Sequence, residues 1–389
     1  MPLITSRHTQ RAKTASRPRD ASCLLIMAMT VGIVLPGPVS AGPTFKGPGD
    51  SSLTLGVWSS AAYTSAEQAD GSHDSDLRLD SFRIITVAKF TKQIGLMTNF
   101  ARLSGESMRL LDLVGQFELA DSVNLWVGRH VVPGDRQQMA GPYFANVWEY
   151  PMVSRNPNAY TGRDDGATLW GSVFDRRLQY MMGAFQGKNR GHDMSNESHQ
   201  LLYASRFAWS FGDRESEYFN SNHYYGEKEI LTVGVAWRTQ KDGVGTALTR
   251  GDYTAWSLDA LMQTRLSAGG VLTLEGAWYD YDTDGVADIS PADPGCSRVT
   301  NCGGATQGDA FLVTAAYMFP QVVGIGRFEP HVRYQEFNVD AGPKSEQWDI
   351  GVNYNISGHS ARLSAVYSDM DTAGSPSTNR FILGLQLMY

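Results

Sequence analysis

Apolar and polar residues alternate over much of the chain, with the two-residue period of a β-strand that buries one face. In residues 327–335, Phe328 and Val332 fall on one face, and charged or polar side chains occupy the other. Residues 347–355 repeat the pattern, with Trp348 on the apolar face. The alternation therefore predicts a protein built from β-strands.

Sixteen segments predict strands. They lie near residues 52–64, 79–92, 94–103, 108–119, 122–132, 163–174, 177–187, 199–211, 229–239, 252–265, 270–283, 308–319, 325–337, 345–355, 360–371 and 378–389. Three features are typical of a transmembrane barrel with a water-filled lumen: the even number of strands, charge on the inward faces, and aromatic residues at the ends of the apolar faces, such as Trp237, Trp256 and Tyr354. We therefore predict an all-β fold, a transmembrane antiparallel β-barrel of about 16 strands. A water-soluble sandwich is the alternative, because it also alternates.

Connections between the predicted strands fit a barrel that crosses the membrane. If the first strand starts in the periplasm, every second connection should be short, and residues 120–121 and 175–176 are examples of such short turns. Most of the remaining connections are longer and polar. Residues 212–228 are the exception, because they form a long connection where a short turn is expected.

Both ends of the chain predict export to a bacterial outer membrane. Residues 1–41 contain a basic stretch, an apolar run of about a dozen residues and a small-residue site, which is the pattern of a signal peptide. A buried N-terminal helix is the alternative. Residues 42–389 would then form the barrel, in contact with outer-membrane lipid. The last segment alternates up to the terminal Tyr389, which resembles the assembly signal of outer-membrane barrels, although an ordinary strand of a soluble sheet could end in the same way.

Charge argues against a nucleic-acid partner. The whole chain has a net charge of −7, and the leader holds five basic residues and one acidic residue, so the exported part carries about −11. Nucleic-acid binding depends on a basic face. We therefore expect no nucleic-acid partner.

One long interruption, residues 134–162, combines several prolines with clustered aromatic residues. Loops of this length are usually functional or disordered, and the aromatic content argues against disorder. We predict that this loop folds into the barrel as a constriction loop, with the aromatic rings pinning it to the wall or narrowing the opening and the two arginines hydrated beside the solute path. The residues assigned to it are Arg136, Tyr143, Phe144, Trp148, Tyr150 and Arg155.

The start of this loop resembles the phosphate-selective porin O/P family. Gly128-Arg129 is followed four residues later by Pro133, residues 162–167 read GRDDGA, and the hairpin up to residue 187 is also similar to that family. The resemblance covers roughly residues 122–187 and implies a sixteen-stranded, usually trimeric pore whose third extracellular loop folds into the lumen. Phosphate selectivity in the family rests partly on lysines at the constriction. Since this loop contains no lysine, we do not extend phosphate specificity to the chain.

Alternation also predicts which charged side chains face the lumen. The inward basic residues are Arg83, Lys89, Arg206, Arg238, Arg265, Arg327, Arg333, Arg362 and Arg380, and the inward acids are Asp112, Glu118, Asp259, Glu275, Glu329 and Asp349. A basic majority predicts a mild preference for anions, because rings of charge set selectivity in pores. The alternative is that these charges pair across strands and stabilise the wall.

Two cysteines of the exported part, Cys296 and Cys302, are separated by five residues in a glycine-rich loop and predict a disulfide. Free thiols are the alternative, and no histidine lies nearby to complete a metal site. The sequence offers no GxSxG motif and no CxxCH haem motif. We therefore predict a porin for passive diffusion of small hydrophilic or anionic solutes, not an enzyme, with no cofactor. The alternative function is a sheath for a partner cytochrome.

Overall fold

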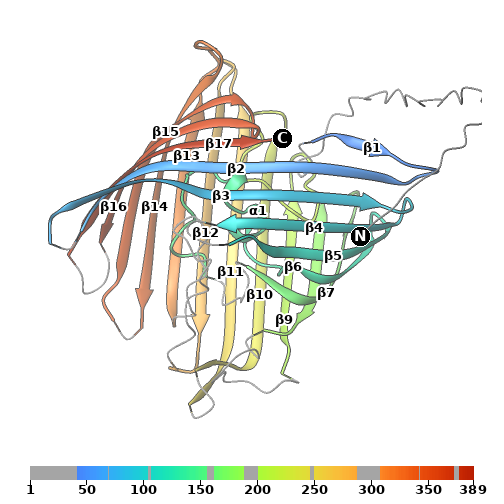
Figure 1. Cartoon of the computed structure of the whole chain (residues 1–389). Coiled ribbons are helices and arrows are strands. Elements are labelled where there is room, and N and C mark those ends of the chain that lie inside the picture. Colours follow the sequence, from blue (N-terminus) through green and yellow to red (C-terminus); the bar gives the residue numbers. More distant parts are fainter. Residues whose placement is uncertain are drawn as a thin grey trace, which may run out of the picture. The chain divides into compact units, whose positions relative to one another are not determined.

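The fold is a closed antiparallel β-barrel. The computed structural model describes residues 42–68, 70–103, 107–155, 162–187, 200–245, 249–286, 307–340, 342–371 and 376–389. Each strand from β2 to β17 pairs with the next along the chain, and β17 pairs back with β2, which closes the ring (Figure 1). The predicted count of sixteen barrel strands is confirmed, and the predicted signal peptide lies outside the described residues.

The strands have the following bounds. They are β1 (Thr44–Lys46), β2 (Ser52–Glu67), β3 (His73–Lys89), β4 (Ile94–Leu103), β5 (Arg109–Ala120), β6 (Val123–Val131), β7 (Arg163–Val173), β8 (Leu178–Phe185), β9 (Leu202–Ser210), β10 (Ile230–Gly245), β11 (Arg250–Arg265), β12 (Val271–Asp282), β13 (Gly308–Met318), β14 (Arg327–Val339), β15 (Ser345–Ser357), β16 (Ala361–Asp371) and β17 (Thr378–Met388). The helices are α1 (Arg136–Ala140) and the 3-10 turn η1 (Pro142–Phe144). The short β1 pairs with β2 and is not counted in the ring of sixteen.

Two strands are longer than the sequence pattern predicts. β3 begins at His73 rather than near residue 79, and β10 continues to Gly245 rather than ending near residue 239. Both extensions are rich in polar residues and have no apolar face. The hydrophobic period therefore ends with the apolar band, whereas the hydrogen-bonded ladder to the neighbouring strand continues beyond it.

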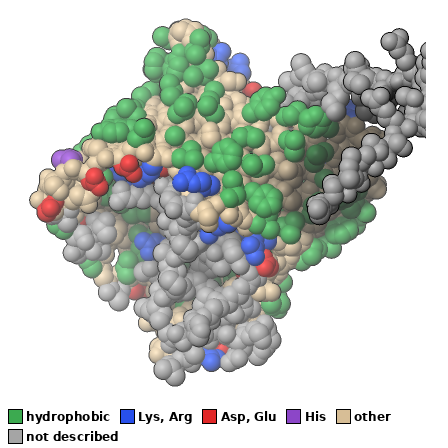
Figure 2. All heavy atoms as spheres, in the orientation of Figure 1, with side chains coloured by type: hydrophobic (Ala, Val, Ile, Leu, Met, Phe, Trp, Pro, Cys, Tyr) green, Lys and Arg blue, Asp and Glu red, His purple; other side chains and the backbone are tan. Residues whose placement is uncertain are grey.

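Alternate side chains of the barrel face outward and are apolar. On three consecutive strands, Phe207, Val235 and Leu258 lie side by side and are exposed. Hydrophobic side chains are spread over the outer surface of the strands in view (Figure 2). An outward apolar surface on a closed barrel is the arrangement that contacts lipid. Among the described residues, no helix is long and apolar enough to cross a membrane.

The buried core lies inside the ring. One cluster groups Phe185, Tyr279 and Phe337 of the wall with Val132 and Val153 of the connection between β6 and β7. A second cluster likewise combines wall residues with residues of connections. Two connections therefore fill much of the space that the sixteen strands enclose.

Candidate functional site

The first of these connections is the predicted inward loop. We call its described part, residues 132–155 between β6 and β7, L3. It begins with α1, where the carboxylate of Asp135 caps the helix by accepting a 3.1 Å hydrogen bond from the Gln137 N–H. Gly141, with φ of +68°, then turns the chain into η1, in a conformation that only glycine adopts freely. Burial raises the pKa of the Asp135 carboxyl, and the nearby carboxylate of Asp259 adds to this shift.

Arginines of the wall hold the main chain of L3. An irregular segment inside a barrel needs partners for its carbonyl groups, which water would otherwise satisfy. Four of the predicted inward arginines supply them. The bonds run from Arg206 to the carbonyl of Gly134 (3.1 Å), from Arg238 to Pro133 (3.0 Å), from Arg362 to Ala145 (2.6 Å) and from Arg333 to Glu149 (2.9 Å).

Aromatic residues of L3 also attach it to the wall. The Trp148 Nε1 donates a 3.1 Å hydrogen bond to the Asp80 carboxylate. Its ring lies against Gly384 of β17, where an added Cβ would approach the ring atoms to 2.6 Å. Tyr143 and Phe144 pack on Trp58 of β2, with ring centroids 5.3 and 5.6 Å apart. These contacts are those expected if the aromatic rings attach the loop to the barrel wall, which was the first of the two roles predicted for them.

The expected hydration of Arg136 is wrong. Its side chain is 1% exposed, and its guanidinium donates two hydrogen bonds, of 2.9 and 2.5 Å, to the carboxylate of Glu215. Burial alone would raise the pKa of Glu215, but the charge and hydrogen bonds of Arg136 outweigh it and hold the pKa below its ordinary value. Arg136 is dry because it forms a buried bidentate pair with Glu215. The prediction did not foresee this pair, since Glu215 lies in a connection to which the sequence pattern assigned no role.

Arg155 and Tyr150 are only partly buried. The Arg155 guanidinium lies over the Phe337 ring at 4.4 Å, and its Nε donates to the Met152 carbonyl. The Tyr150 hydroxyl hydrogen-bonds with Ser154 at 2.9 Å. Arg155 is therefore the L3 arginine that keeps partial contact with water.

The second connection inside the barrel, which we call T4, comprises residues 211–229 between β9 and β10. It leaves the barrel wall at the end where the other connections are short, and it is the long exception noted in the sequence. Residues 220–223 are buried, as is Tyr218, whose ring stacks on Trp126 of β6 at 4.1 Å and whose hydroxyl donates to the Val131 carbonyl. The inward position of T4 was not predicted, although its five aromatic residues, Phe211, Tyr218, Phe219, Tyr224 and Tyr225, carry the same signal that identified L3.

T4 meets L3 in the lumen. The main-chain N–H of Asn222 donates to the carbonyl of Phe144, and its side-chain amide donates to Gln137. The Asn222 carbonyl accepts from the side chain of Asn146. These three bonds are each 3.0 Å long. Together with the Arg136–Glu215 pair, they join two segments that enter the barrel from opposite ends.

T4 also reaches strands on the far side of the ring. His223 hydrogen-bonds with Glu329 of β14. In the turn between β15 and β16, the Nε2 of His359 lies 3.0 Å from the His223 carbonyl, and its Nδ1 lies 3.2 Å from the Tyr225 hydroxyl. A carbonyl only accepts, so Nε2 carries a proton and donates to the His223 carbonyl. Burial lowers the pKa of His359 to about 3, which favours the neutral ring, and in that form Nδ1 accepts from the Tyr225 hydroxyl.

The remaining predicted inward charges are mostly paired. Carboxylate partners are Asp259 for Arg206 (2.6 Å), Asp349 for Arg333 (2.8 Å), Glu149 for Arg380 and Glu118 for Lys89. Arg265 and Arg327 are exposed at strand ends. Asp112, on the inner face of β5, accepts from Arg163. Glu275 accepts from Gln137 of L3.

The predicted basic majority concerned the barrel wall, and it does not extend to the whole buried interior of the described residues. That interior contains seven arginines and ten carboxylates, because L3, T4 and the unassigned Asp80 and Asp164 add acids that the pattern did not count. Pairing across the wall and onto L3 therefore accounts for most of the inward charge.

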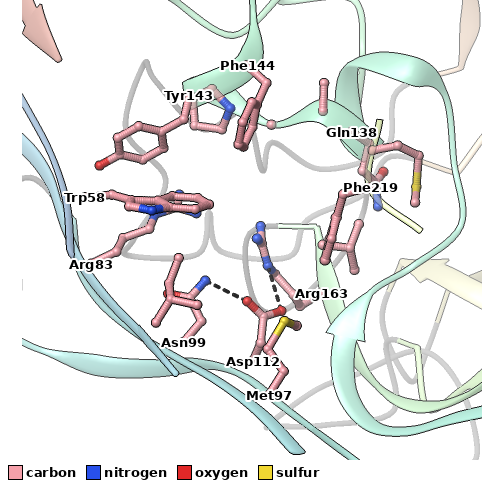
Figure 3. A pocket seen from close by; sticks show the side chains of 16 residues that line it. Trp58, Arg83, Met97, Asn99, Asp112, Gln138, Tyr143, Phe144, Arg163 and Phe219 are labelled. Atoms are coloured by element: carbon pink, nitrogen blue, oxygen red, sulfur yellow. Dashed lines mark hydrogen bonds and ion pairs between the residues drawn. The ribbon is translucent and has the colours of Figure 1, made fainter. Parts of the chain in front are cut away.

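A cavity remains between L3 and the wall formed by β2 to β7. Its volume is about 50 Å³, enough for several water molecules, since one needs roughly 10–15 Å³. Trp58 and Arg83 line one side, Tyr143 and Phe144 close it from L3, and Arg163 points into it (Figure 3). Among the described residues, no group of three or more His, Cys, Asp or Glu side chains could hold a metal. Cys296 and Cys302 lie outside the described residues, so their disulfide stays a prediction.

Comparisons with known proteins agree with this fold. No protein-family model matches the chain, and no curated protein matches it. The anion-selective porin from Comamonas acidovorans has a TM-score of 0.58 and 13% identity, covering 87% of this chain and 100% of that chain. OmpF of Salmonella typhi, in complex with daunomycin, gives 0.59 and 11%, covering 89% and 100%. OmpT of Vibrio cholerae, in a trimer form, gives 0.54 and 12%, covering 87% and 100%.

At these identities, the comparisons carry the fold alone. That fold is the one of bacterial outer-membrane porins, so the predicted fold class and its location in an outer membrane agree with the solved structures. The narrower resemblance to phosphate-selective porins stays a prediction, because no family model supports it.

Proposed function

We propose that the chain is an outer-membrane porin through which small hydrophilic solutes diffuse passively. The observation that carries this proposal is a closed sixteen-stranded barrel, apolar outside and polar inside, with a loop fixed across its lumen. A barrel of this size encloses an aqueous channel unless its interior is filled. Segments that fold inward then determine how wide the channel is.

L3 and T4 together form the narrowest section in this proposal. L3 is supported by wall arginines, and T4 is joined to it through Asn222 and Glu215. Solutes pass beside these segments, along the wall of β2 to β7 where the cavity remains. The constriction is therefore built from two connections rather than from L3 alone.

We also propose a mild preference for anions, which rests on the net charge of the residues that line the cavity rather than on a general excess of basic residues. Around the cavity, the charged lining residues are Arg83, Arg163 and Asp112, which sum to +1. Since Asp112 is already paired with Arg163 at 3.2 Å, the charge of Arg83 is left to act on the solute. A single uncompensated cation in a narrow section favours anions without excluding cations.

Planar-bilayer recording of the purified protein in salt gradients tests the pore. Deleting Met139–Val153 from L3, or replacing T4 with a short turn, should raise single-channel conductance, because each removes material from the lumen. Each variant is first checked for a heat-modifiable barrel on a denaturing gel. An intact barrel whose conductance is unchanged by both deletions would contradict the proposed constriction, and an intact wild-type barrel that does not conduct would contradict the pore itself.

Two further parts of the reading are proposals of the same kind. A homotrimer is expected, and chemical cross-linking in detergent followed by mass analysis tests it. The cytochrome sheath is disfavoured, because L3 and T4 occupy the lumen that a partner would enter. The absence of enzymatic activity stays a prediction, to be tested by a lipase assay of the pure protein.

A further inference from the structure

We propose that the connection between β13 and β14 inserts into the periplasmic leaflet of the outer membrane and anchors the barrel by contact with lipid acyl chains. We call this connection, residues 320–325, the apolar turn. It lies at the end of the barrel where most connections are short, and the short turns of outer-membrane barrels face the periplasm. Because the apolar turn belongs to the outer surface, this contact does not depend on whether the barrel conducts.

The side chains of the apolar turn are exposed although most of them are hydrophobic. Val322, Val323 and Ile325 are 60%, 51% and 71% exposed. A contiguous exposed patch of this kind marks contact with a membrane or with another protein. By contrast, Asp121 and Arg176, in two other turns at the same end of the barrel, form an exposed ion pair at 2.5 Å, which suits water. The apolar turn is suited to an apolar environment instead.

The apolar turn continues the lipid-facing surface of its hairpin. Phe319, the residue before the turn, packs edge-to-face on Tyr317 of β13 with ring centroids 5.2 Å apart. On the other side, Phe328 of β14 packs on Tyr354 of β15 at 4.9 Å. Phe319 and Phe328 are both exposed, and neither ring has a polar group that would favour water. The outer surface of the barrel therefore stays apolar up to the turn.

The height of this apolar surface leaves room in the membrane for the turn. On β13, the outward apolar residues run from Phe311 to Phe319, which is eight residue steps. Eight steps cover about 26 Å along a strand and, at a tilt of about 40°, about 20 Å across the membrane. The apolar band of such barrels is about 25 Å tall. The outward face of β13 becomes charged at Asp309, so the apolar turn supplies the remaining height at the opposite end.

Hydrogen bonds prepare the backbone of the apolar turn for an apolar environment. Polar backbone groups in lipid need partners within the protein, because no water is available there. The Tyr354 hydroxyl donates a 2.5 Å hydrogen bond to the Val323 carbonyl and accepts one of 3.0 Å from the Ile325 N–H. Val323 and Gly326 exchange two further backbone bonds, of 2.8 and 3.3 Å. A side chain of the neighbouring strand thus takes the place that water would have in an ordinary exposed turn.

The two polar side chains beside the apolar residues set a shallow depth. Gln321 and Arg327 are exposed at the base of the turn. A long arginine side chain can reach lipid phosphates or water while its neighbours contact acyl chains. Insertion therefore places Val322 and Ile325 among the acyl carbons nearest the headgroups rather than at the centre of the bilayer.

Electron paramagnetic resonance of the spin-labelled exported protein in phospholipid vesicles tests the proposal. A nitroxide is attached at V322C or I325C, in a background in which C296S and C302S remove the other thiols of the exported part. Oxygen is apolar and concentrates among acyl chains, whereas a charged nickel complex stays in water. The ratio of oxygen to nickel collisions should be several-fold higher at both positions than at S267C. Ser267 is the matched control, because it is exposed in the neighbouring turn between β11 and β12.

The role of the Tyr354 hydroxyl is tested separately. Y354F should lower the oxygen-to-nickel ratio of the V322C label, because two backbone groups of the apolar turn lose their partner and then favour water. Y367F removes a hydroxyl from another exposed tyrosine of the outer surface and should leave the ratio unchanged. Equal ratios in Y354F and Y367F would contradict the role of the hydroxyl in holding the turn in lipid.

Three results would overturn the lipid contact. Labels at V322C and I325C that meet nickel as often as the S267C label does would place the apolar turn in water. Labels shielded from both reagents would show that a protein covers the turn. Labels that couple magnetically with those of a second copy would identify that protein as this chain itself. Bilayer recording is independent of all three, so a barrel with the expected ratios that does not conduct would reject the porin only.

Discussion

The Arg136–Glu215 pair gives the sharpest test of how L3 and T4 hold each other. R136M would leave the Glu215 carboxylate buried, with the Tyr224 hydroxyl, which donates to it at 2.5 Å, as its main remaining donor. Removing one partner of a buried ion pair costs about 3–5 kcal/mol. At about 1.4 kcal/mol per factor of ten, the equilibrium between released and docked loops should shift by between about a hundredfold and a few thousandfold. The released state should then appear as frequent steps to higher conductance.

The double variant R136M/E215L separates the buried charge from the loss of contacts. Both side chains are 2% exposed or less, so an apolar pair of similar volume removes the uncompensated carboxylate and should restore much of the quiet wild-type current. R176M is the matched control, because Arg176 pairs with Asp121 in an exposed turn, where ion pairs contribute little. Planar-bilayer current noise is measured for all three variants at equal voltage and salt. Should R136M be as quiet as R176M, or the double variant as noisy as R136M, the buried pair does not hold the loops together.

Four further outcomes follow from the fold. G384L should displace the Trp148 ring of L3 and increase current noise, and G384A should increase it less. Equal noise in the two variants would contradict the close contact between Gly384 and Trp148. V235R on the lipid-facing surface should lower the free energy of unfolding by about 2–4 kcal/mol in refolding titrations into lipid vesicles, whereas V235L should not. Equal stability of the two variants would show that this face does not contact lipid. Mass spectrometry without reduction should find Cys296 linked to Cys302, and two free thiols in fresh protein would refute this. Lowering the pH from 7 to 4 should loosen T4 and raise current noise, and unchanged noise would contradict this prediction. The docked His359 stays neutral down to about pH 3, whereas the released side chain takes up a proton near pH 6.5. The contribution of His359 to the stability of the docked state is therefore complete above pH 6.5 and is lost as the pH falls.

Local pattern determined the barrel. A lipid-exposed strand must present apolar side chains at every second position, so residues such as those of β14 and β15 reveal both the strand and its face without any knowledge of their neighbours. The same physics explains the errors at β3 and β10, where the polar ends of strands leave the apolar band but keep their backbone pairing. Proline and aromatic content likewise identified L3 before its position inside the barrel was known.

Tertiary structure alone decided what the inward charges do. Alternation placed Arg206, Arg333 and Arg362 on the inner face, but whether such a charge is free or paired depends on a group on another strand or in L3. The partner of Arg136 is 79 residues away in T4, a separation at which sequence pattern carries no information. Interior charges interact through space in a setting of low dielectric, so their roles depend on distances that only the folded chain fixes.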